Sequence, residues 1–250
     1  MSCQFFIVGA QRSATTWLYK MLDQHPQVEM AKPMRPEPKF FLRDELFARG
    51  IGYYEQTYYA GKEGMVRGEK STSYIESRVA AERIARCFPD ARIIFFLRDP
   101  IRRAISNYRF SHQLGFETAS MEEAFCNEEQ RREDYDKSKV SASPYAYLSR
   151  GEYIRYLRMY EEYFSADQLH VFVSENVVGC AEGLRTVYGA LGVNRVFNPA
   201  GIESAVNQSS GDEPVTMSKH LREMLQARFA ESNAALAARY GLDLSRWSAS

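Results

Sequence analysis

Residues 9–16 form a short segment whose residue types suit the binding of an anion. An apolar run at residues 5–8 ends at Gly9, and the hydroxyl-bearing residues Ser13 and Thr16 lie where a helix is expected to begin. Backbone N–H groups at a helix N-terminus are unpaired and carry the positive end of the helix dipole, so phosphate or sulfate oxygens bind there readily. The sequence therefore predicts an anion site in this loop.

The loop differs at two positions from the phosphate loop G-x-x-x-x-G-K-[ST] of nucleotide triphosphatases. Read from the first glycine, that pattern places glycine, lysine and Ser/Thr where this chain has Ala14, Thr15 and Thr16. The lysine is absent, and Arg12 is the cation of the loop. We expect a cradle for an anion other than a nucleotide triphosphate.

A second strand-to-helix junction carries further polar groups. The apolar run at residues 91–97 is the strongest strand signal, and Asp99 with Pro100 is typical of a helix start. Arg98 stands at the end of this strand, and Ser106 lies two turns into the following helix. A ligand with two separate phosphate-type groups would suit the two junctions. The alternative for Arg98 is a structural salt bridge with a neighbouring carboxylate.

Apolar periodicity predicts the elements that position these residues. Strands are predicted at 5–8, 91–97 and 169–173, and residues 66–74 are predicted as a strand that runs into a turn. Helices are predicted at 15–24, 77–87, 101–114, 121–131, 153–164, 181–191 and 217–240. Alternating strands and helices indicate an α/β fold with a central parallel sheet flanked by helices, and 250 residues suit a single domain, 1–250. Ligands of such sheets bind at the carboxyl ends of the strands, where both junctions fall.

Composition limits the class of protein. The 32 basic and 32 acidic residues balance, which argues against a general binder of nucleic acid. The four cysteines show no C-x-x-C pairing, so neither a disulfide framework nor a metal site is indicated, and we expect reduced thiols and a cytoplasmic location. No apolar run approaches the roughly 20 residues of a membrane span, so we expect no transmembrane segment and no signal peptide.

Taken together, the motifs resemble those of the sulfotransferases that use 3′-phosphoadenosine 5′-phosphosulfate (PAPS). Residues 9–17 resemble the 5′-phosphosulfate loop of that family, and residues 96–108 resemble its 3′-phosphate element. Further similarity lies at residues 22–26, 37–41, 69–74, 149–153 and 241–247. The segments Glu-Pro-Lys-Phe-Phe and Glu-Lys-Ser-Thr-Ser-Tyr are closer to the bacterial and Golgi heparan-sulfate type than to the cytosolic phenol and steroid enzymes.

The resemblance implies a P-loop-like sulfotransferase fold and an enzyme that transfers a sulfuryl group from PAPS to an acceptor hydroxyl of a sugar or small metabolite. The implied general base is Glu37, with Lys70 and Arg12 stabilising charge at the bridging oxygen. The product is 3′-phosphoadenosine 5′-phosphate, and no metal is implied because protein donors can stabilise a sulfuryl group in flight. The implied donor-binding residues are Arg12, Ser13, Ala14, Thr15, Thr16, Trp17, Arg98 and Ser106.

One segment departs from the family pattern. Heparan-sulfate enzymes place a K-G-R-like sequence over the donor, whereas residues 207–212 of this chain contain no cation. Asn207 and Ser209 are candidate neutral substitutes, and Arg150 is another candidate. Residues 133–147, which are charged and tyrosine-rich, are expected to form a mobile loop near the acceptor site.

Two other functions stay open at this point. A kinase for a nucleotide or small molecule with a degenerate phosphate loop would need magnesium and ATP, and a nucleotide-binding module without catalysis would bind donor product but sulfate no acceptor. Glu37 alone would be an ordinary solvated carboxylate in a proline-rich loop, and Lys70 a surface lysine. The Tyr53-Tyr54 and Tyr58-Tyr59 pairs would bind an acceptor ring or simply pack.

Overall fold

The structure is a computed structural model that describes residues 4–62, 64–136, 143–203 and 217–247. The chain divides into two compact units, one of residues 1–97 and 157–206 and the other of residues 98–156 and 207–250. Helix α8 (Tyr153–Glu161) begins in the second unit and continues into the first. The first unit carries the β-sheet, and the second is helical.

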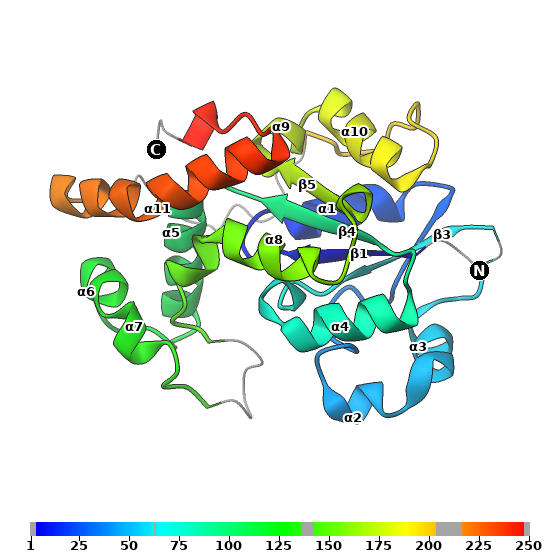
Figure 1. The fold of residues 1–250 in the computed structure, drawn as a ribbon, viewed down its shortest axis with the longest axis horizontal. Coiled ribbons are helices and arrows are strands. Elements are labelled where there is room, and N and C mark those ends of the chain that lie inside the picture. The colour runs from blue at the N-terminus through cyan, green and yellow to red at the C-terminus, as the bar shows by residue number, and fades with distance from the viewer. Residues whose placement is uncertain (1–3, 63, 137–142, 204–216, 248–250) are drawn as a thin grey trace. The chain divides into compact units, whose positions relative to one another are not determined.

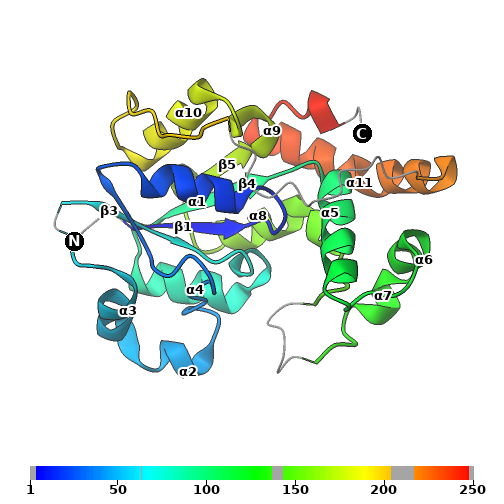
Figure 2. The same ribbon diagram turned by 180° about the vertical axis from the view of Figure 1, so that it is seen from behind.

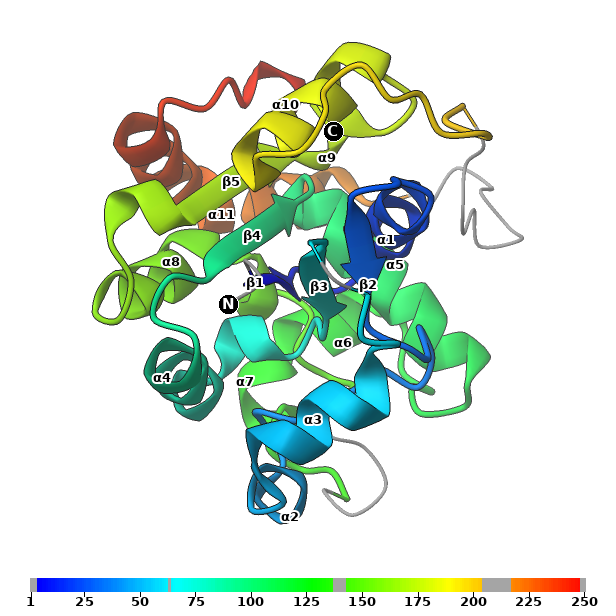
Figure 3. The ribbon, with the colours of Figure 1, turned by 90° about the vertical axis from the view of Figure 1, so that its right-hand side faces the viewer.

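The sheet of the first unit has five strands, all parallel, in the order β2-β3-β1-β4-β5 (Figure 3). The strands are β1 (Gln4–Gly9), β2 (Val28–Met30), β3 (Val66–Lys70), β4 (Arg92–Leu97) and β5 (Leu169–Val173). The predicted α/β architecture with a central parallel sheet is confirmed. The segment 66–74, predicted as a strand that runs into a turn, contains β3, which ends at Lys70 before a turn and a short 3₁₀ helix, η1 (Tyr74–Glu76).

Helices cover both faces of this sheet. Figure 2 shows α1 (Thr15–Asp23) and α10 (Ala181–Leu191) in front of the strands, and Figure 1 shows α4 (Arg78–Cys87) on the opposite side. Leu18 of α1 and Val187 of α10 share one buried cluster with Phe96 of β4. On the other face, the rings of Phe6 and Phe88 lie 5.9 Å apart. The remaining elements of this unit are α2 (Asp44–Phe47), α3 (Gly50–Tyr58), η3 (Ala166–Gln168) and α9 (Ser174–Val177).

Helix α4 buries one face and exposes the other. Val79 is 47% exposed although it is apolar. The buried face of α4 is defined by Ala80, Ala81 and Ile84. Since each helical residue turns by about 100°, Val79 lies about 140° around the helix from Ile84. It therefore faces solvent.

The second unit packs its helices around a small apolar core. Its elements are α5 (Pro100–Gln113), α6 (Met121–Cys126), α7 (Glu128–Arg131), η2 (Ser149–Gly151), α11 (Lys219–Tyr240) and η4 (Ser245–Trp247). Ile101 of α5, Phe125 of α6 and Phe229 of α11 belong to one buried cluster. None of the helices within the described ranges is long and apolar enough to cross a membrane.

Candidate active site

The loop after β1 has the backbone geometry of an anion cradle. Arg12 and Ala14 adopt left-handed conformations, with φ of 67° and 60°. The Ser13 N–H donates to the Ala10 carbonyl at 3.3 Å, which closes the loop into a turn. Helix α1 then begins at Thr15 with no side-chain cap, and the Trp17 N–H donates to the Ala14 carbonyl at 2.9 Å, so the N–H groups of Thr15 and Thr16 are the ones without a helical acceptor. Turns of this kind gather backbone N–H groups around a concave site for an anion.

Gly9 and Ser13 show how tightly this loop is packed. A Cβ at Gly9 would lie 2.8 Å from the Cβ of Ile75, so glycine allows β1 to end against η1. The Ser13 side chain is fully buried, and its Oγ has no hydrogen-bond partner in the described part of the chain. A buried polar group without a partner costs roughly 1–3 kcal/mol. An oxygen of a bound anion would satisfy this hydroxyl.

The first turn of α1 joins the loop to two other segments. The indole N–H of Trp17, which is buried in the core, donates to the Ile202 carbonyl at 3.2 Å. The Arg35 guanidinium donates to the Thr16 Oγ at 3.5 Å. Arg35 was not among the residues selected from the sequence, although its position in a proline-rich loop next to Glu37 was a usable signal. It adds a second cation beside the loop.

Glu37 is held by groups at the end of β3. The Lys70 ammonium donates to its Oε1, and the Thr72 backbone N–H donates to its Oε2 at 2.9 Å. The Thr72 hydroxyl lies 3.1 Å from both carboxylate oxygens. The side chain of Lys70 is 3% exposed and that of Glu37 is 15% exposed. The carboxylate is therefore fixed and partly shielded from water, unlike the solvated loop residue of the alternative interpretation.

The strand register places this pair next to the anion cradle. Lys70 of β3 lies opposite Ile7 of β1, two residues before Gly9. The Ser71 N–H continues the pairing by donating to the Ile7 carbonyl at 3.2 Å. Because β1 and β3 are parallel, their carboxyl ends meet at the same edge of the sheet. A carboxylate, an ammonium and a loop rich in N–H donors are thus brought together.

A second carboxylate, Glu69, lies beneath the site and is fully buried. It accepts hydrogen bonds from the Tyr54 hydroxyl at 2.8 Å and the Ser71 hydroxyl at 2.6 Å. Burial raises the pKa of Glu69 to about 7, because desolvation outweighs the lowering effect of the hydroxyl donors. The sequence indicated Glu69 only as part of the Glu-Lys-Ser-Thr-Ser-Tyr segment and as a candidate salt-bridge partner of Arg98.

In the Tyr53-Tyr54 and Tyr58-Tyr59 pairs, three tyrosines, Tyr54, Tyr58 and Tyr59, pack rather than line an open site. Tyr54 is fully buried, and Tyr58 and Tyr59 are each 8% exposed. The Tyr54 and Tyr59 hydroxyls lie 3.0 Å apart and both accept from the Gln4 amide. These rings therefore belong to the interior of the first unit.

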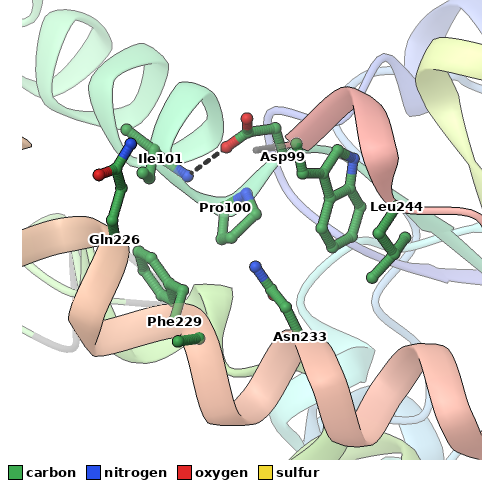
Figure 4. Close-up of a pocket in the computed structure, with 9 residues that line it drawn as sticks. Asp99, Pro100, Ile101, Gln226, Phe229, Asn233 and Leu244 are labelled. Atoms are coloured by element: carbon green, nitrogen blue, oxygen red, sulfur yellow. Dashed lines mark hydrogen bonds between the residues drawn. The ribbon is translucent and has the colours of Figure 1, made fainter. Parts of the chain in front are cut away.

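Arg98 and Ser106 belong to the second unit, and both are partly exposed. The Asp99 Oδ1 accepts from the N–H groups of Ile101, at 2.8 Å, and Arg102, at 3.2 Å, which caps α5 as predicted (Figure 4). This cap fixes the start of the helix that carries Ser106.

The capped start of α5 also lines a pocket within the second unit (Figure 4). The pocket has a volume of about 420 Å³. Phe229 and Asn233 of α11 and Leu244, which precedes η4, form the opposite side. Its lining is mainly apolar, which fits a packing hollow at the helix ends.

Two further expectations fall on or beside residues that the structure does not describe. Asn207 and Ser209 lie outside the described residues, as do residues 137–142 of the expected loop at 133–147. At the far end of that loop, Tyr147 is fully buried and its hydroxyl donates to Glu117 at 2.9 Å. Arg150 is also buried and donates to the Ser143 carbonyl at 2.7 Å. The mobility of the loop stays a prediction.

Among the described residues, no group of three or more His, Cys, Asp or Glu side chains is arranged to hold a metal ion. The free cysteines include Cys87, Cys126 and Cys180. The site therefore consists of hydroxyl, carboxylate, cationic and backbone groups.

Solved structures with a similar fold include two sulfotransferases. A sulfotransferase from Alicyclobacillus acidocaldarius is 29% identical, with a TM-score of 0.80 over 99% of each chain. The sulfotransferase domain of the Synechococcus PCC 7002 olefin synthase has a TM-score of 0.53 at 16% identity, covering 98% of this chain and 96% of that one. The second likeness concerns the fold alone.

Sequence relatives carry sulfotransferase names as well. Mouse heparan sulfate glucosamine 3-O-sulfotransferase 3A1 is 29% identical over 196 residues, which are 78% of this chain and 47% of the relative. Human heparan sulfate glucosamine 3-O-sulfotransferase 6 is 35% identical over 105 residues, which are 42% of this chain and 29% of the relative. The chain thus spans about half or less of the length of these curated relatives. Residues 3–178 match the family model described as a sulfotransferase domain, and the chain belongs to the sulfotransferase family.

Proposed function

We propose that this chain transfers the sulfuryl group of PAPS to an acceptor hydroxyl. The observation that carries the proposal is the Glu37–Lys70 ion pair, which lies at the sheet edge where the cradle loop begins. Membership of the sulfotransferase family supports the reaction class. The acceptor, the donor and the roles of individual residues are parts of the proposal.

Donor binding in this proposal uses the loop and α1. Backbone N–H groups of residues 12–16, the Ser13 hydroxyl and the Arg12 side chain hold the 5′-phosphosulfate. Arg98 and Ser106 hold the 3′-phosphate, and Asn207, Ser209 or Arg150 replaces the basic segment that covers the donor in heparan-sulfate enzymes. A buried hydroxyl that has no partner in the described residues, that of Ser13, supports this use of the loop.

The chemical step in this proposal is an in-line displacement at sulfur. The acceptor oxygen forms a bond to sulfur while the bond from sulfur to the 5′-phosphate oxygen breaks. Glu37 takes the proton of the acceptor hydroxyl, and the leaving phosphate keeps the electron pair of the broken bond. Lys70 and Arg12 stabilise the negative charge that develops on the bridging oxygen.

The Glu37–Lys70 pair suits both proposed roles, proton removal by Glu37 and charge stabilisation by Lys70. Thr72 and Lys70 hold the carboxylate in one orientation, so little reorganisation is needed before the proton is taken. Lys70 can then shift from the carboxylate towards the leaving oxygen, because the protonated Glu37 no longer carries a charge. The ammonium would follow the negative charge during the reaction.

For the acceptor, we propose a hydroxyl of a sugar or small metabolite. The names of the two relatives described above specify a glucosamine hydroxyl of heparan sulfate, which favours a glycan. A cytoplasmic location stays a prediction from cysteine usage. Independence from metal stays a prediction from the chemistry of sulfuryl transfer.

The kinase and the non-catalytic module are not favoured. At the position of the Walker lysine the structure has Thr15, in the first turn of α1. The family model that matches residues 3–178 describes a sulfotransferase domain, and the solved structure at 29% identity is a sulfotransferase.

A screen with sulfur-labelled PAPS tests the proposal. Glycan, phenol and lipid acceptors are offered separately, and we expect label transfer to at least one glycan or small-molecule hydroxyl, unaffected by EDTA. Turnover that needs magnesium and ATP would instead establish the kinase. Calorimetric binding of 3′-phosphoadenosine 5′-phosphate without transfer to any acceptor would establish the non-catalytic module.

A further inference from the structure

Glu69 is a carboxylate inside the sheet that the proposed reaction does not use. Its side chain is fully buried, and no cation of the described residues forms an ion pair with it. Instead it accepts from the hydroxyls of Tyr54 and Ser71, and a further hydroxyl, that of Tyr74, lowers its pKa by hydrogen bonding. Burying a charged carboxylate whose hydrogen-bond donors are all hydroxyl groups costs free energy of folding. An apolar side chain would therefore suit a purely structural position better.

Ser71 connects this carboxylate to the loop that carries Glu37. Its Oγ donates to Glu69 and accepts the backbone N–H of Lys39 at 2.9 Å. Lys39 has a left-handed φ of 50°, a conformation that a non-glycine residue holds only when its surroundings impose it. The Ser71 bond is one such constraint, two residues from Glu37.

The direction of these hydrogen bonds follows from the donors available. The Lys39 N–H can only donate, so the Ser71 oxygen accepts and must send its own hydrogen elsewhere. The ionised Glu69 provides the acceptor for that hydrogen. Lys70, which follows Glu69 in the chain, binds Glu37 directly, and so does Thr72. Consecutive residues of β3 and its extension therefore hold both ends of the segment 37–39.

We propose that Glu69 is a positioning residue for Glu37: it orients the Ser71 hydroxyl, which holds the Lys39 backbone and so fixes the loop that presents the base. This inference rests on the proposed role of Glu37. Glu69 itself touches neither Glu37 nor the loop through a hydrogen bond of its own, and its effect passes through Ser71.

The surroundings of Glu69 make this arrangement sensitive to pH. The groups that face Glu69 are Tyr54 of α3, Tyr59 directly after α3, Tyr74 of η1 and the negatively charged Glu37. Each of the three tyrosines has a raised pKa and stays neutral near pH 7. The nearest cation on the same strand besides Lys70 is Arg67, which is paired with Glu29 and Glu55.

Protonation would change the direction of the hydrogen bonds at Glu69. Burial places the pKa of Glu69 at about 7, so the carboxyl gains its proton as pH falls through neutrality. A protonated carboxyl adds a donor where Tyr54 and Ser71 now donate and accepts hydrogen bonds more weakly, so the hydrogen bonds that orient these hydroxyls weaken or change direction. The ordered state of the loop therefore belongs to the ionised form, and activity should rise as pH increases through about 7.

The first test compares Glu69→Gln with a matched control in the same sheet. Glu29→Gln removes another buried carboxylate, which accepts from the Ala60 N–H and Arg67 and has no bond to Ser71. We expect Glu69→Gln to lower kcat about tenfold and to leave the Kd for 3′-phosphoadenosine 5′-phosphate within twofold of wild type. The variant should also lose the increase of activity with pH near neutrality, which we call the pH limb. Glu29→Gln should keep that limb. A wild-type kcat and pH profile in Glu69→Gln would overturn the proposal.

Two further variants separate positioning from a general structural role. Ser71→Ala should reproduce the loss seen in Glu69→Gln, whereas Ser71→Thr keeps the hydroxyl and should restore at least half of the activity. Tyr54→Phe removes a donor to the carboxylate, so the pH limb should move upward rather than disappear. Equal losses in Ser71→Ala and Ser71→Thr, or an unmoved limb in Tyr54→Phe, would contradict the inference.

A readout that needs no turnover distinguishes this inference from the proposed function. The amide resonance of Lys39 in isotope-labelled protein should titrate with Glu69 in wild type and lose that titration in Glu69→Gln and Ser71→Ala. If no acceptor is ever sulfated while the Lys39 resonance titrates as expected, the proposed function fails and the coupling stands. If sulfation is measured and the Lys39 resonance ignores Glu69, the coupling fails and the function stands.

Discussion

The Lys70 ammonium donates to the Glu37 carboxylate, and this ion pair ties the end of β3 to a loop that precedes it by 33 residues. Both side chains are largely shielded from water, with exposed fractions of 3% and 15%. Such a pair holds its carboxylate in one orientation, because both oxygens also accept from Thr72. A carboxylate held in one orientation can take the proton of a bound acceptor hydroxyl without first rearranging, which suits a general base.

Glu37→Gln tests this base most directly. An amide cannot take a proton, so we expect sulfuryl transfer to fall by about 10²-fold or more. Donor-product affinity, measured by calorimetry with 3′-phosphoadenosine 5′-phosphate, should stay close to wild type. Glu55→Gln, at an exposed carboxylate of α3, serves as the control. Near-normal turnover in Glu37→Gln would remove Glu37 from the mechanism.

Ser13→Ala tests the anion cradle without touching a cation. The hydroxyl is buried without a partner in the described residues, so its removal should keep or raise the midpoint of urea unfolding. A hydrogen bond to a charged group contributes about 1.5–3 kcal/mol, so donor-product affinity should weaken by about tenfold or more. Tyr188→Phe removes another buried hydroxyl without a partner among those residues and should leave affinity unchanged. Equal affinities for wild type and Ser13→Ala would show that the donor does not reach this hydroxyl.

Arg98→Ala tests the binding of the 3′-phosphate. Wild type should bind 3′-phosphoadenosine 5′-phosphate more tightly than adenosine 5′-phosphate, because Arg98 and Ser106 contact the extra phosphate in the proposed complex. We expect Arg98→Ala to reduce this difference about tenfold or more while changing the affinity for adenosine 5′-phosphate less than twofold. Calorimetry with both nucleotides measures the effect. A parallel loss for both would mean that Arg98 supports the fold or another part of the donor.

The pH dependence of stability checks the burial of Glu69. Its pKa is about 7 in the folded chain and ordinarily 4.5, so the folded state holds the proton more tightly. The free energy of unfolding should therefore fall as pH rises between these values, and the cost is fully present above the folded pKa. We expect wild type to lose on the order of 1–3 kcal/mol from pH 5 to pH 8 relative to Glu69→Gln. Urea unfolding at the two pH values measures this difference, and parallel pH profiles would contradict it.

Gly9→Ala tests the close packing of the cradle against η1. The added Cβ would lie 2.8 Å from the Cβ of Ile75, so the loop or η1 must shift. We expect a loss of about 1–3 kcal/mol in the free energy of unfolding, the usual cost of overpacking. Gly52→Ala, in α3 where a new Cβ meets nothing within 4 Å, should instead be neutral or stabilising by up to about 1 kcal/mol. Similar effects of the two substitutions would show that residue 9 is not tightly packed.

The elements with strong local signals were predicted from the sequence. The predicted helix 181–191 matches α10, and the glycine after it has the left-handed φ of 67° that this helix end requires. The strand 169–173 is likewise confirmed as β5. By contrast, β2 (Val28–Met30) has only three residues and was missed, because a strand so short shows no periodicity. Helix α3 was also missed, since its tyrosines and glycines carry little helical preference.

The sequence by itself determined the reaction class, because the residues that mark it stand in contiguous motifs. Residues 9–17 and 37–41 are such motifs, and each can be interpreted without knowing what packs against it. The tertiary structure decided that the Glu37 carboxylate is paired with Lys70 and that Glu69 is buried on the hydroxyls of Tyr54 and Ser71. These relationships depend on parallel strands and loops that are far apart in the chain. Burial and pairing arise from the packing of such segments, which no local pattern encodes.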